Sequence, residues 1–297
     1  MPRASFRLEM LQVARLAPKL LGESADLVAG FLSAHLDPSG GFVNRGGKPD
    51  LYYTVFGLEA MMALHREPPK EQIGSWLRTL AVGEDLDFIH LCSLARVAAS
   101  LGGDVFSAEE REKMVSLLAT FRTADGGFHV SRGSKTGSAY GALIAHGAYD
   151  DLGVPCPEED RLLQSVLALQ LEDGSFANEQ GIPQGTSTTT AAAVTLCRHL
   201  NHPLSGQTGA WLLQCFHPGG GFLAIPQAPL PDLLSTAVVL HALDGLEVSF
   251  AGQREMCLDF VDSLWSAEGG FHGHWADDDL DCEYTYYGLL ALGHLSL

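Results

Sequence analysis

The chain has 297 residues, of which 46% are hydrophobic and 18% are charged, so it contains enough apolar material for a large folded core. Its 36 acidic residues against 18 lysines and arginines give a net charge of -18, which argues against nucleic acid or an anionic membrane surface as the main partner. No run of 18 apolar residues occurs, so we expect no membrane span. The six cysteines are scattered and form no CxxC pair, and the first residues lack a signal-peptide core, so we expect free thiols in a cytoplasmic protein.

In chain order, the sequence predicts an amphipathic N-terminal helix over about residues 7–20, followed by repeats from about residue 24 to residue 297. Successive phenylalanines of a Gly-Phe motif are 86, 48, 46 and 49 residues apart. The long first interval predicts a hidden repeat near residue 85, which makes six units in one domain, 1–297. The motifs are Gly40-Gly41-Phe42, Gly126-Gly127-Phe128, Gly174-Ser175-Phe176, Gly220-Gly221-Phe222 and Gly269-Gly270-Phe271.

Every unit has the same internal order. A segment with charged and apolar faces at helical spacing precedes the glycines, and a more apolar segment rich in alanine and leucine follows them. The first segment predicts an outer helix and the second an inner helix, with the glycines in a tight turn and the phenylalanine packed between helices. A single helix pair cannot bury its apolar face, so the pairs must stack into an open solenoid or a closed ring.

These repeats resemble those of protein prenyltransferase β subunits and of squalene-hopene and oxidosqualene cyclases, over residues 24–297. The resemblance implies an all-α (α6/α6) toroid barrel in which the inner helices surround an apolar cavity for an isoprenoid chain. It also implies that the N-termini of the inner helices share one end of the barrel, where their dipoles favour a diphosphate. A helical partner subunit, as for a β subunit, or a homodimer is compatible with this resemblance.

The starts of the inner helices should therefore form a ring of polar side chains. An aspartate or threonine in this ring can be a simple helix cap, but five aspartates around one cavity also suggest a functional site. The tyrosines would line the cavity. The ring contains Asp50, Tyr52, Tyr53, Asp85, Asp87, His90, Ser138, Tyr140, Thr186, Ser187, Asp232, Ser235, Asp281, Cys282, Glu283 and Tyr284.

The resemblance implies a zinc site made of Asp-x-Cys at the fifth inner helix and a histidine at the sixth. This chain has Asp232 followed by two leucines, and Tyr284 at the histidine position, so only the aspartate is retained. A shifted site could use His272 with His274, Asp281 and Cys282, or the acidic loop there could simply be solvated. Zinc or magnesium is the metal that we expect, if one is bound.

The resemblance to class II terpene cyclases implies a proton-donating aspartate, but Leu234 stands at its position. Two carboxylates spaced i, i+2 could replace it, because mutual repulsion favours one proton on such a pair. The candidates for a relocated acid are Asp85 with Asp87, and Asp279 with Asp281.

Cations are scarce, which makes their positions informative. Arg45 and Lys48 precede the first inner helix, and His129, Arg132 and Lys135 precede the third. They could clamp a diphosphate, or they could be ordinary loop residues.

The sequence therefore favours a prenyltransferase-like enzyme that binds an isoprenoid diphosphate in a central apolar cavity. Its catalytic candidates are Asp87, Asp232, Asp281 and Tyr284. Asp50, Tyr53, His90 and Tyr140 join the five loop residues as candidates for substrate binding. One alternative is a small class II terpene cyclase with a relocated aspartic acid, and another is a noncatalytic lipid-binding or scaffold barrel.

Overall fold

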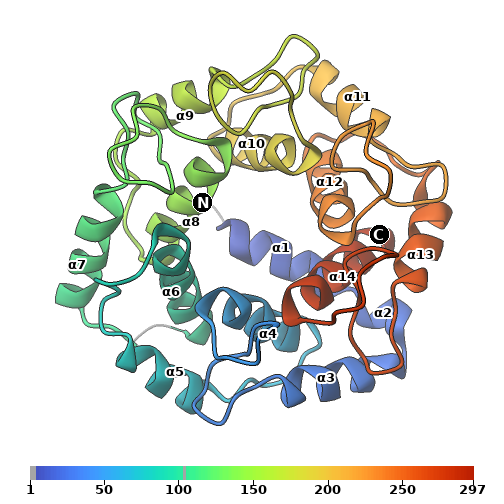
Figure 1. Cartoon of the computed structure of the whole chain (residues 1–297), viewed down its shortest axis with the longest axis horizontal. Coiled ribbons are helices and arrows are strands. Elements are labelled where there is room, and N and C mark those ends of the chain that lie inside the picture. The colour runs from blue at the N-terminus through green and yellow to red at the C-terminus, as the bar shows by residue number, and fades with distance from the viewer. Residues whose placement is uncertain (1–4, 103–104) are drawn as a thin grey trace.

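The computed structural model describes residues 5–102 and 105–297, and these residues form helices and connecting loops without a β-strand. Six inner helices follow one another around a ring, and the last packs against the first, so the ring is closed (Figure 1). The inner helices are α4 (Leu51–Ala63), α6 (Phe88–Leu101), α8 (Ala139–Asp151), α10 (Ser187–His199), α12 (Leu233–Gly245) and α14 (Cys282–Leu295).

Six outer helices surround this ring, and each packs on an inner helix that is next to it in the sequence. The predicted all-α toroid of six helix pairs is confirmed, including the hidden second pair, α5 and α6. The outer helices bury little: α9 buries only Leu162, Ser165 and Val166. They are α3 (Ser24–Ala34), α5 (Lys70–Thr79), α7 (Ala108–Ala119), α9 (Glu159–Leu167), α11 (Gly206–Gln214) and α13 (Arg254–Ser263).

The Gly-Phe turns join outer to inner helices. Gly220 has φ of 96°, and a Cβ there would lie 2.1 Å from the carbonyl oxygen of Met256, so the turn requires glycine. The phenylalanine that follows the turn is buried in every copy of the motif. At Gly57 a Cβ would lie 2.3 Å from the ring of Phe42, so this phenylalanine packs directly on the inner helix backbone.

A threonine one turn into the inner helix fixes this arrangement. In the fifth repeat, the Phe222 amide donates to the Thr236 hydroxyl at 2.9 Å, and that hydroxyl donates to the carbonyl oxygen of the N-cap residue Asp232. A cap followed four residues later by threonine therefore ties the turn to the helix start. The same bond to the phenylalanine amide recurs at Thr54, Thr190 and Thr285.

The N-terminal segment closes one end of the ring. It forms two helices, α1 (Phe6–Ala14) and α2 (Pro18–Leu21), instead of the one predicted over residues 7–20, because Pro18 has no amide to continue α1. α1 lies across the centre of the ring in Figure 1. Ion pairs join Arg7 to Asp151 at the end of α8, and Glu9 to Arg198 near the end of α10.

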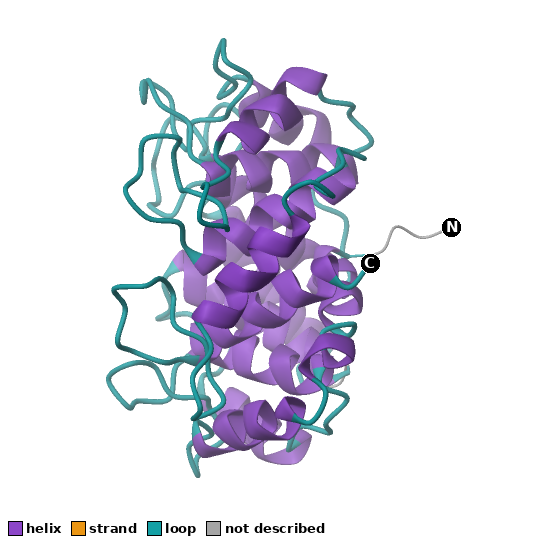
Figure 2. Ribbon diagram, turned by 90° about the vertical axis from the view of Figure 1, so that its right-hand side faces the viewer, coloured by secondary structure: helices purple, strands orange, loops and turns teal. Residues whose placement is uncertain are grey.

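The two ends of the toroid therefore differ. The long loops between outer and inner helices all lie on one side in Figure 2, and the C-terminus lies on the other. The loop side, where the inner helices begin, is called the mouth below, and the end covered by α1 is called the floor. No helix in residues 5–102 or 105–297 has the length and apolar character needed to cross a bilayer.

Candidate functional site

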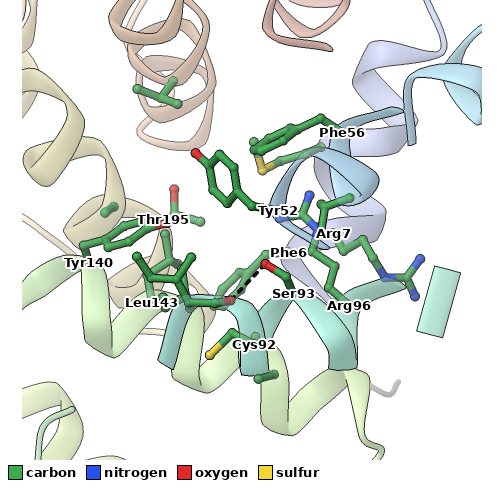
Figure 3. A pocket seen from close by; sticks show the side chains of 18 of the residues that line it. Phe6, Arg7, Tyr52, Phe56, Cys92, Ser93, Arg96, Tyr140, Leu143 and Thr195 are labelled. Atoms are coloured by element: carbon green, nitrogen blue, oxygen red, sulfur yellow. Dashed lines mark hydrogen bonds between the residues drawn. The ribbon is translucent and has the colours of Figure 1, made fainter. Parts of the chain in front are cut away.

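A cavity of about 780 Å³ occupies the ring between the mouth and the floor. Aromatic and aliphatic side chains from the inner helices form most of its wall, among them Tyr52, Phe56, Tyr140 and Leu143 (Figure 3). Tyr287 joins this wall from α14. The volume is within the range of small-molecule sites, and the wall suits an elongated apolar ligand.

Three of the predicted residues meet at the mouth. Asp87 caps α6, and its Oδ1 lies 2.9 Å from His90 Nδ1. The other ring nitrogen, Nε2, lies 3.5 Å from Oδ2 of Asp50, the cap of α4. Burial opposes the charge on His90, but hydrogen bonding and attraction to Asp87 and then Asp50 raise its pKa overall. The mouth thus holds a histidine that favours its charged form between two carboxylates.

Asp87 itself is poorly suited to donate a proton. Its side chain is 64% exposed. Burial acts to raise its pKa, but the hydrogen bonds from the His90 backbone and ring outweigh this and lower the pKa. The carboxyl is therefore ionised at neutral pH, and it contributes negative charge at the mouth.

A different carboxyl group at the mouth can carry a proton near neutral pH. The Tyr52 hydroxyl donates to Glu283 Oε1 at 2.6 Å, across the seam between the first and the last inner helix. Burial raises the pKa of Glu283 to about 7; the Tyr52 bond opposes this, Asp281 adds to it and Arg45 opposes it. Because Tyr52 lines the cavity, this pair connects a protonatable acid to the apolar wall.

The sequence placed both residues in the ring but assigned them no chemistry. A signal was present: Glu283 stands among tyrosines just after the cap of the last inner helix. A glutamate in such surroundings loses contact with water, and this burial raises its pKa. Its partner, Tyr52, lies 231 residues away in the sequence, and only closure of the ring brings the two together.

Two arginines line the cavity toward the floor, and both are paired. Arg96 makes two bonds of 2.8 and 2.6 Å to the fully buried Glu59, and Arg7 contacts Asp151 at 3.0 Å. Burial raises the pKa of Asp151 to about 6, although Arg7 and Arg96 oppose the shift. These carboxylates neutralise the cations nearest to the cavity.

The predicted cationic clamp is not assembled around the cavity. Arg45 donates to Asp281 at 2.7 Å and to Asp277 at 2.9 Å, and Arg132 bonds Thr120 and stacks on an outer phenylalanine. His129 lies 3.5 Å from a glutamate in the next repeat. The side chains of Lys48 and Lys135 are exposed, and none of the five predicted residues is among the described residues that line the cavity.

The residues at the implied zinc position do not fit a metal ion. Both oxygens of Asp232 accept bonds from Ser235, at 2.7 and 2.6 Å. Leu234, which stands at the cysteine position and also at the class II acid position, lines the cavity. The guanidinium carbon of Arg45 lies over the Tyr284 ring, 5.5 Å from the ring centre. The three residues at the implied zinc position therefore provide one carboxylate, which already accepts hydrogen bonds, and no nitrogen or sulfur ligand.

The residues of the alternative metal site in the last repeat also make other contacts. Asp281 caps α14 through the Tyr284 amide and accepts from Arg45. Burial raises the pKa of Cys282, which keeps its thiol protonated. His272 Nδ1 lies 3.2 Å from a backbone carbonyl oxygen. In the described part of the chain, the one group of three metal-type side chains that converges lies elsewhere, so a metal at the mouth stays a prediction.

Comparison with known proteins establishes the family. The sequence profile of the prenyltransferase alpha-alpha toroid domain matches residues 19–91, 86–202 and 190–296. The chain therefore belongs to this family. A search of curated proteins finds no match.

Solved structures share the fold at low identity. One is a variant of the type II terpene cyclase MstE from Scytonema in complex with geranylgeranyl dihydroxybenzoate, with a TM-score of 0.63, 13% identity, and coverage of 94% of this chain and 97% of the cyclase. Another is Candida albicans protein geranylgeranyltransferase-I complexed with GGPP, with a TM-score of 0.53, 15% identity, and coverage of 96% and 81%. A Salegentibacter α-1,6-mannanase matches with a TM-score of 0.62, 12% identity, and coverage of 92% and 98%. The toroid thus carries several chemistries, and the site must decide the function.

Proposed function

We propose that this protein is a cyclase-like enzyme that encloses a polyprenyl chain in the central cavity and starts the reaction with a proton from Glu283, passed through Tyr52. The observation that carries the proposal is the 2.6 Å bond between a cavity-wall hydroxyl and a carboxyl whose pKa is raised to about 7. A general acid needs to be protonated near the working pH, and burial supplies this condition.

The cavity supports the choice of substrate class. Its wall is largely apolar, and Tyr52, Phe56, Tyr140 and Tyr287 bring aromatic rings to it. Aromatic faces stabilise a carbocation as it forms along a bound chain. A structurally similar cyclase holds a ligand with a geranylgeranyl group, which agrees with a chain of isoprenoid type.

The charge at the mouth favours protonation over transfer. Asp50 and Asp87 border the cavity there, and the described cations nearest to it already pair with carboxylates. A departing diphosphate would find no free cationic clamp to neutralise its charge, whereas protonation of an alkene leaves the diphosphate attached to the chain. The prenyltransferase interpretation stays a prediction. Free diphosphate is the product that would distinguish this reaction from the proposed cyclisation.

The proposed step is balanced in protons and electrons. Before the step, the hydrogen bond between the two groups reverses, so that protonated Glu283 donates to the Tyr52 oxygen and the Tyr52 O–H turns toward the bound chain. This O–H bond then breaks as a C–H bond forms at one alkene carbon, and the Glu283 proton passes to the tyrosine oxygen. The alkene π electrons form the new bond and leave a cation on the adjacent carbon. A second alkene attacks this cation to close a ring. The ring cation then loses a proton to solvent, which gives a cyclic isomer of the substrate, and solvent reprotonates Glu283.

The test is conversion of geranylgeranyl diphosphate, followed by mass spectrometry. Wild-type protein should yield a cyclic isomer, and Glu283→Gln and Tyr52→Phe should each lower the rate at least about a hundredfold, the lower range for a general acid. Glu268→Gln, at an exposed glutamate in the last Gly-Phe turn, is the matched control and should react like wild type. Full activity of Glu283→Gln would overturn the assigned role.

A cavity variant separates binding from chemistry. Ala192 lines the cavity, so Ala192→Trp should fill it and abolish binding of a fluorescent polyprenyl analogue. Binding by the wild type without any conversion would identify a lipid-binding barrel and contradict the enzymatic part. Unchanged binding by Ala192→Trp would place the ligand outside the cavity.

A further inference from the structure

A second polar cluster lies at the floor end of the ring, away from the mouth. His146 and Asp150 are one turn apart on α8, and His199 is near the end of the neighbouring helix α10. Asp150 Oδ2 is 3.1 Å from His199 Nε2 and 3.6 Å from His146 Nδ1. All three ligand atoms lie within 4.8 Å of one another, so two imidazoles and a carboxylate point to one place.

The spacing of these atoms matches the spacing around a metal ion. Bonds of about 2.0–2.1 Å at a tetrahedral angle place neighbouring ligand atoms about 3.3 Å apart. The distances of 3.1 and 3.6 Å bracket this value. An ion could therefore enter with small side-chain adjustments.

A second observation also points to a ligand. His146 is 1% exposed, and its Nδ1 is a buried atom without a hydrogen-bond partner among the described residues. An unsatisfied buried nitrogen has a free-energy cost unless another group contacts it. This nitrogen is the one nearest to Asp150, so the unsatisfied atom faces the centre of the cluster.

The surroundings have the features of a metal-site outer shell. His146 Nε2 lies 3.0 Å from Glu159 Oε1, a contact that orients the ring and directs Nδ1 toward Asp150. The ring of Phe6 packs on His199, with ring centres 4.2 Å apart, and covers the cluster from α1. Asp150 is 26% exposed, which leaves a path for an ion and a water molecule from solvent.

We propose that His146, Asp150 and His199 bind a divalent transition-metal ion such as Zn²⁺ at the floor end of the toroid, with water in the remaining position. Two imidazoles favour a transition metal over Mg²⁺ or Ca²⁺. The ion ties the C-terminal ends of α8 and α10 together beneath Phe6. The site is separate from the Glu283–Tyr52 pair, and its test does not depend on turnover.

The chain offers a matched control at the same end of the ring. His241 and His294 are also buried, and their ring nitrogens lie 3.1 Å apart. The nearest carboxylate contact is 3.8 Å, from Asp244 to His294. This pair does not form a converging group of three among the described residues, so His241→Ala removes a buried histidine without removing a proposed ligand.

The experiment measures metal content and Zn²⁺ affinity of tag-free, full-length protein. After dialysis against chelator, wild type should bind about one Zn²⁺ per chain in calorimetric titration, and Zn²⁺ should raise its melting temperature. His146→Ala, His199→Ala and Asp150→Asn should each weaken binding by at least about tenfold, and His241→Ala should keep wild-type affinity. Bound Co²⁺ should give the visible absorption bands of a low-coordinate nitrogen and oxygen site.

Several results would overturn the proposal. Absence of saturable Zn²⁺ binding by folded wild type would do so, as would wild-type affinity in the His146→Ala/His199→Ala double variant. Circular dichroism of each variant separates lost binding from lost folding. If the alanine variants unfold, the folded Asp150→Asn variant decides, and unchanged affinity there would contradict the site.

Discussion

The acid assigned to Glu283 has a measurable effect on stability. Its pKa in the folded protein is raised from 4.5 to about 7, chiefly by burial. A raised pKa means that the folded state holds the proton more tightly than the unfolded state, so this group supports folding below about pH 4.5 and loses that contribution as pH rises through 7. This pKa shift corresponds to about 3 kcal/mol in the free energy of unfolding. Solvent screening at a partly buried site lowers the expected contribution to about 2–3 kcal/mol.

Glu283→Gln removes the ionisation and keeps a polar partner for Tyr52. Between pH 5 and pH 8, the free energy of unfolding of wild type should fall by about 2–3 kcal/mol more than that of the variant. Urea denaturation of both proteins at both pH values measures this difference. The contributions of the other titrating groups cancel because they are common to wild type and variant. Parallel pH curves, within about 0.5 kcal/mol, would refute the raised pKa. Glu268→Gln should follow the wild-type curve.

Three further predictions concern the framework that positions the site. Glu59→Gln leaves the Arg96 guanidinium buried without its carboxylate, so chemical denaturation should show a loss of about 3–5 kcal/mol, and a loss below 1 kcal/mol would contradict this ion pair. Thr236→Val deprives the Phe222 amide of its acceptor and should cost about 1–3 kcal/mol, whereas Thr236→Ser should retain most of that stability. Gly57→Ala should lower stability by about 1–3 kcal/mol, seen as a lower melting temperature, because its methyl group would overlap the phenylalanine of the first turn.

The sequence predicted the repeats well because their signals are local. The Gly-Phe turn, the cap and the apolar inner segment all lie within one unit, and the doubled first interval between phenylalanines indicated the pair α5 and α6. The N-terminal helix was predicted too long, since Pro18 ends its hydrogen-bonding pattern.

The site was harder to predict because its contacts join distant repeats. Arg45 was expected to be available for a diphosphate, but ring closure places it against Asp277 and Asp281, more than 230 positions along the chain. The same closure pairs Tyr52 with Glu283. Spacing along one helix can show which residues share a face, but not which carboxylate of another repeat will meet them.

The floor cluster illustrates the same limit. His146 and Asp150 are four residues apart, a spacing that puts them on one face of α8. The third member, His199, comes from the next inner helix, and its contact with Asp150 depends on how far the two helices slide past each other. No local pattern distinguishes His199 among the twelve histidines of the chain.

The most direct test of proton-initiated cyclisation is the reaction of geranylgeranyl diphosphate in heavy water. Our account predicts a cyclic product that retains its diphosphate and gains one deuterium from solvent, with both the product and the label lost in Glu283→Gln. A product that lacks solvent deuterium and releases diphosphate would contradict the account and support a prenyltransferase instead.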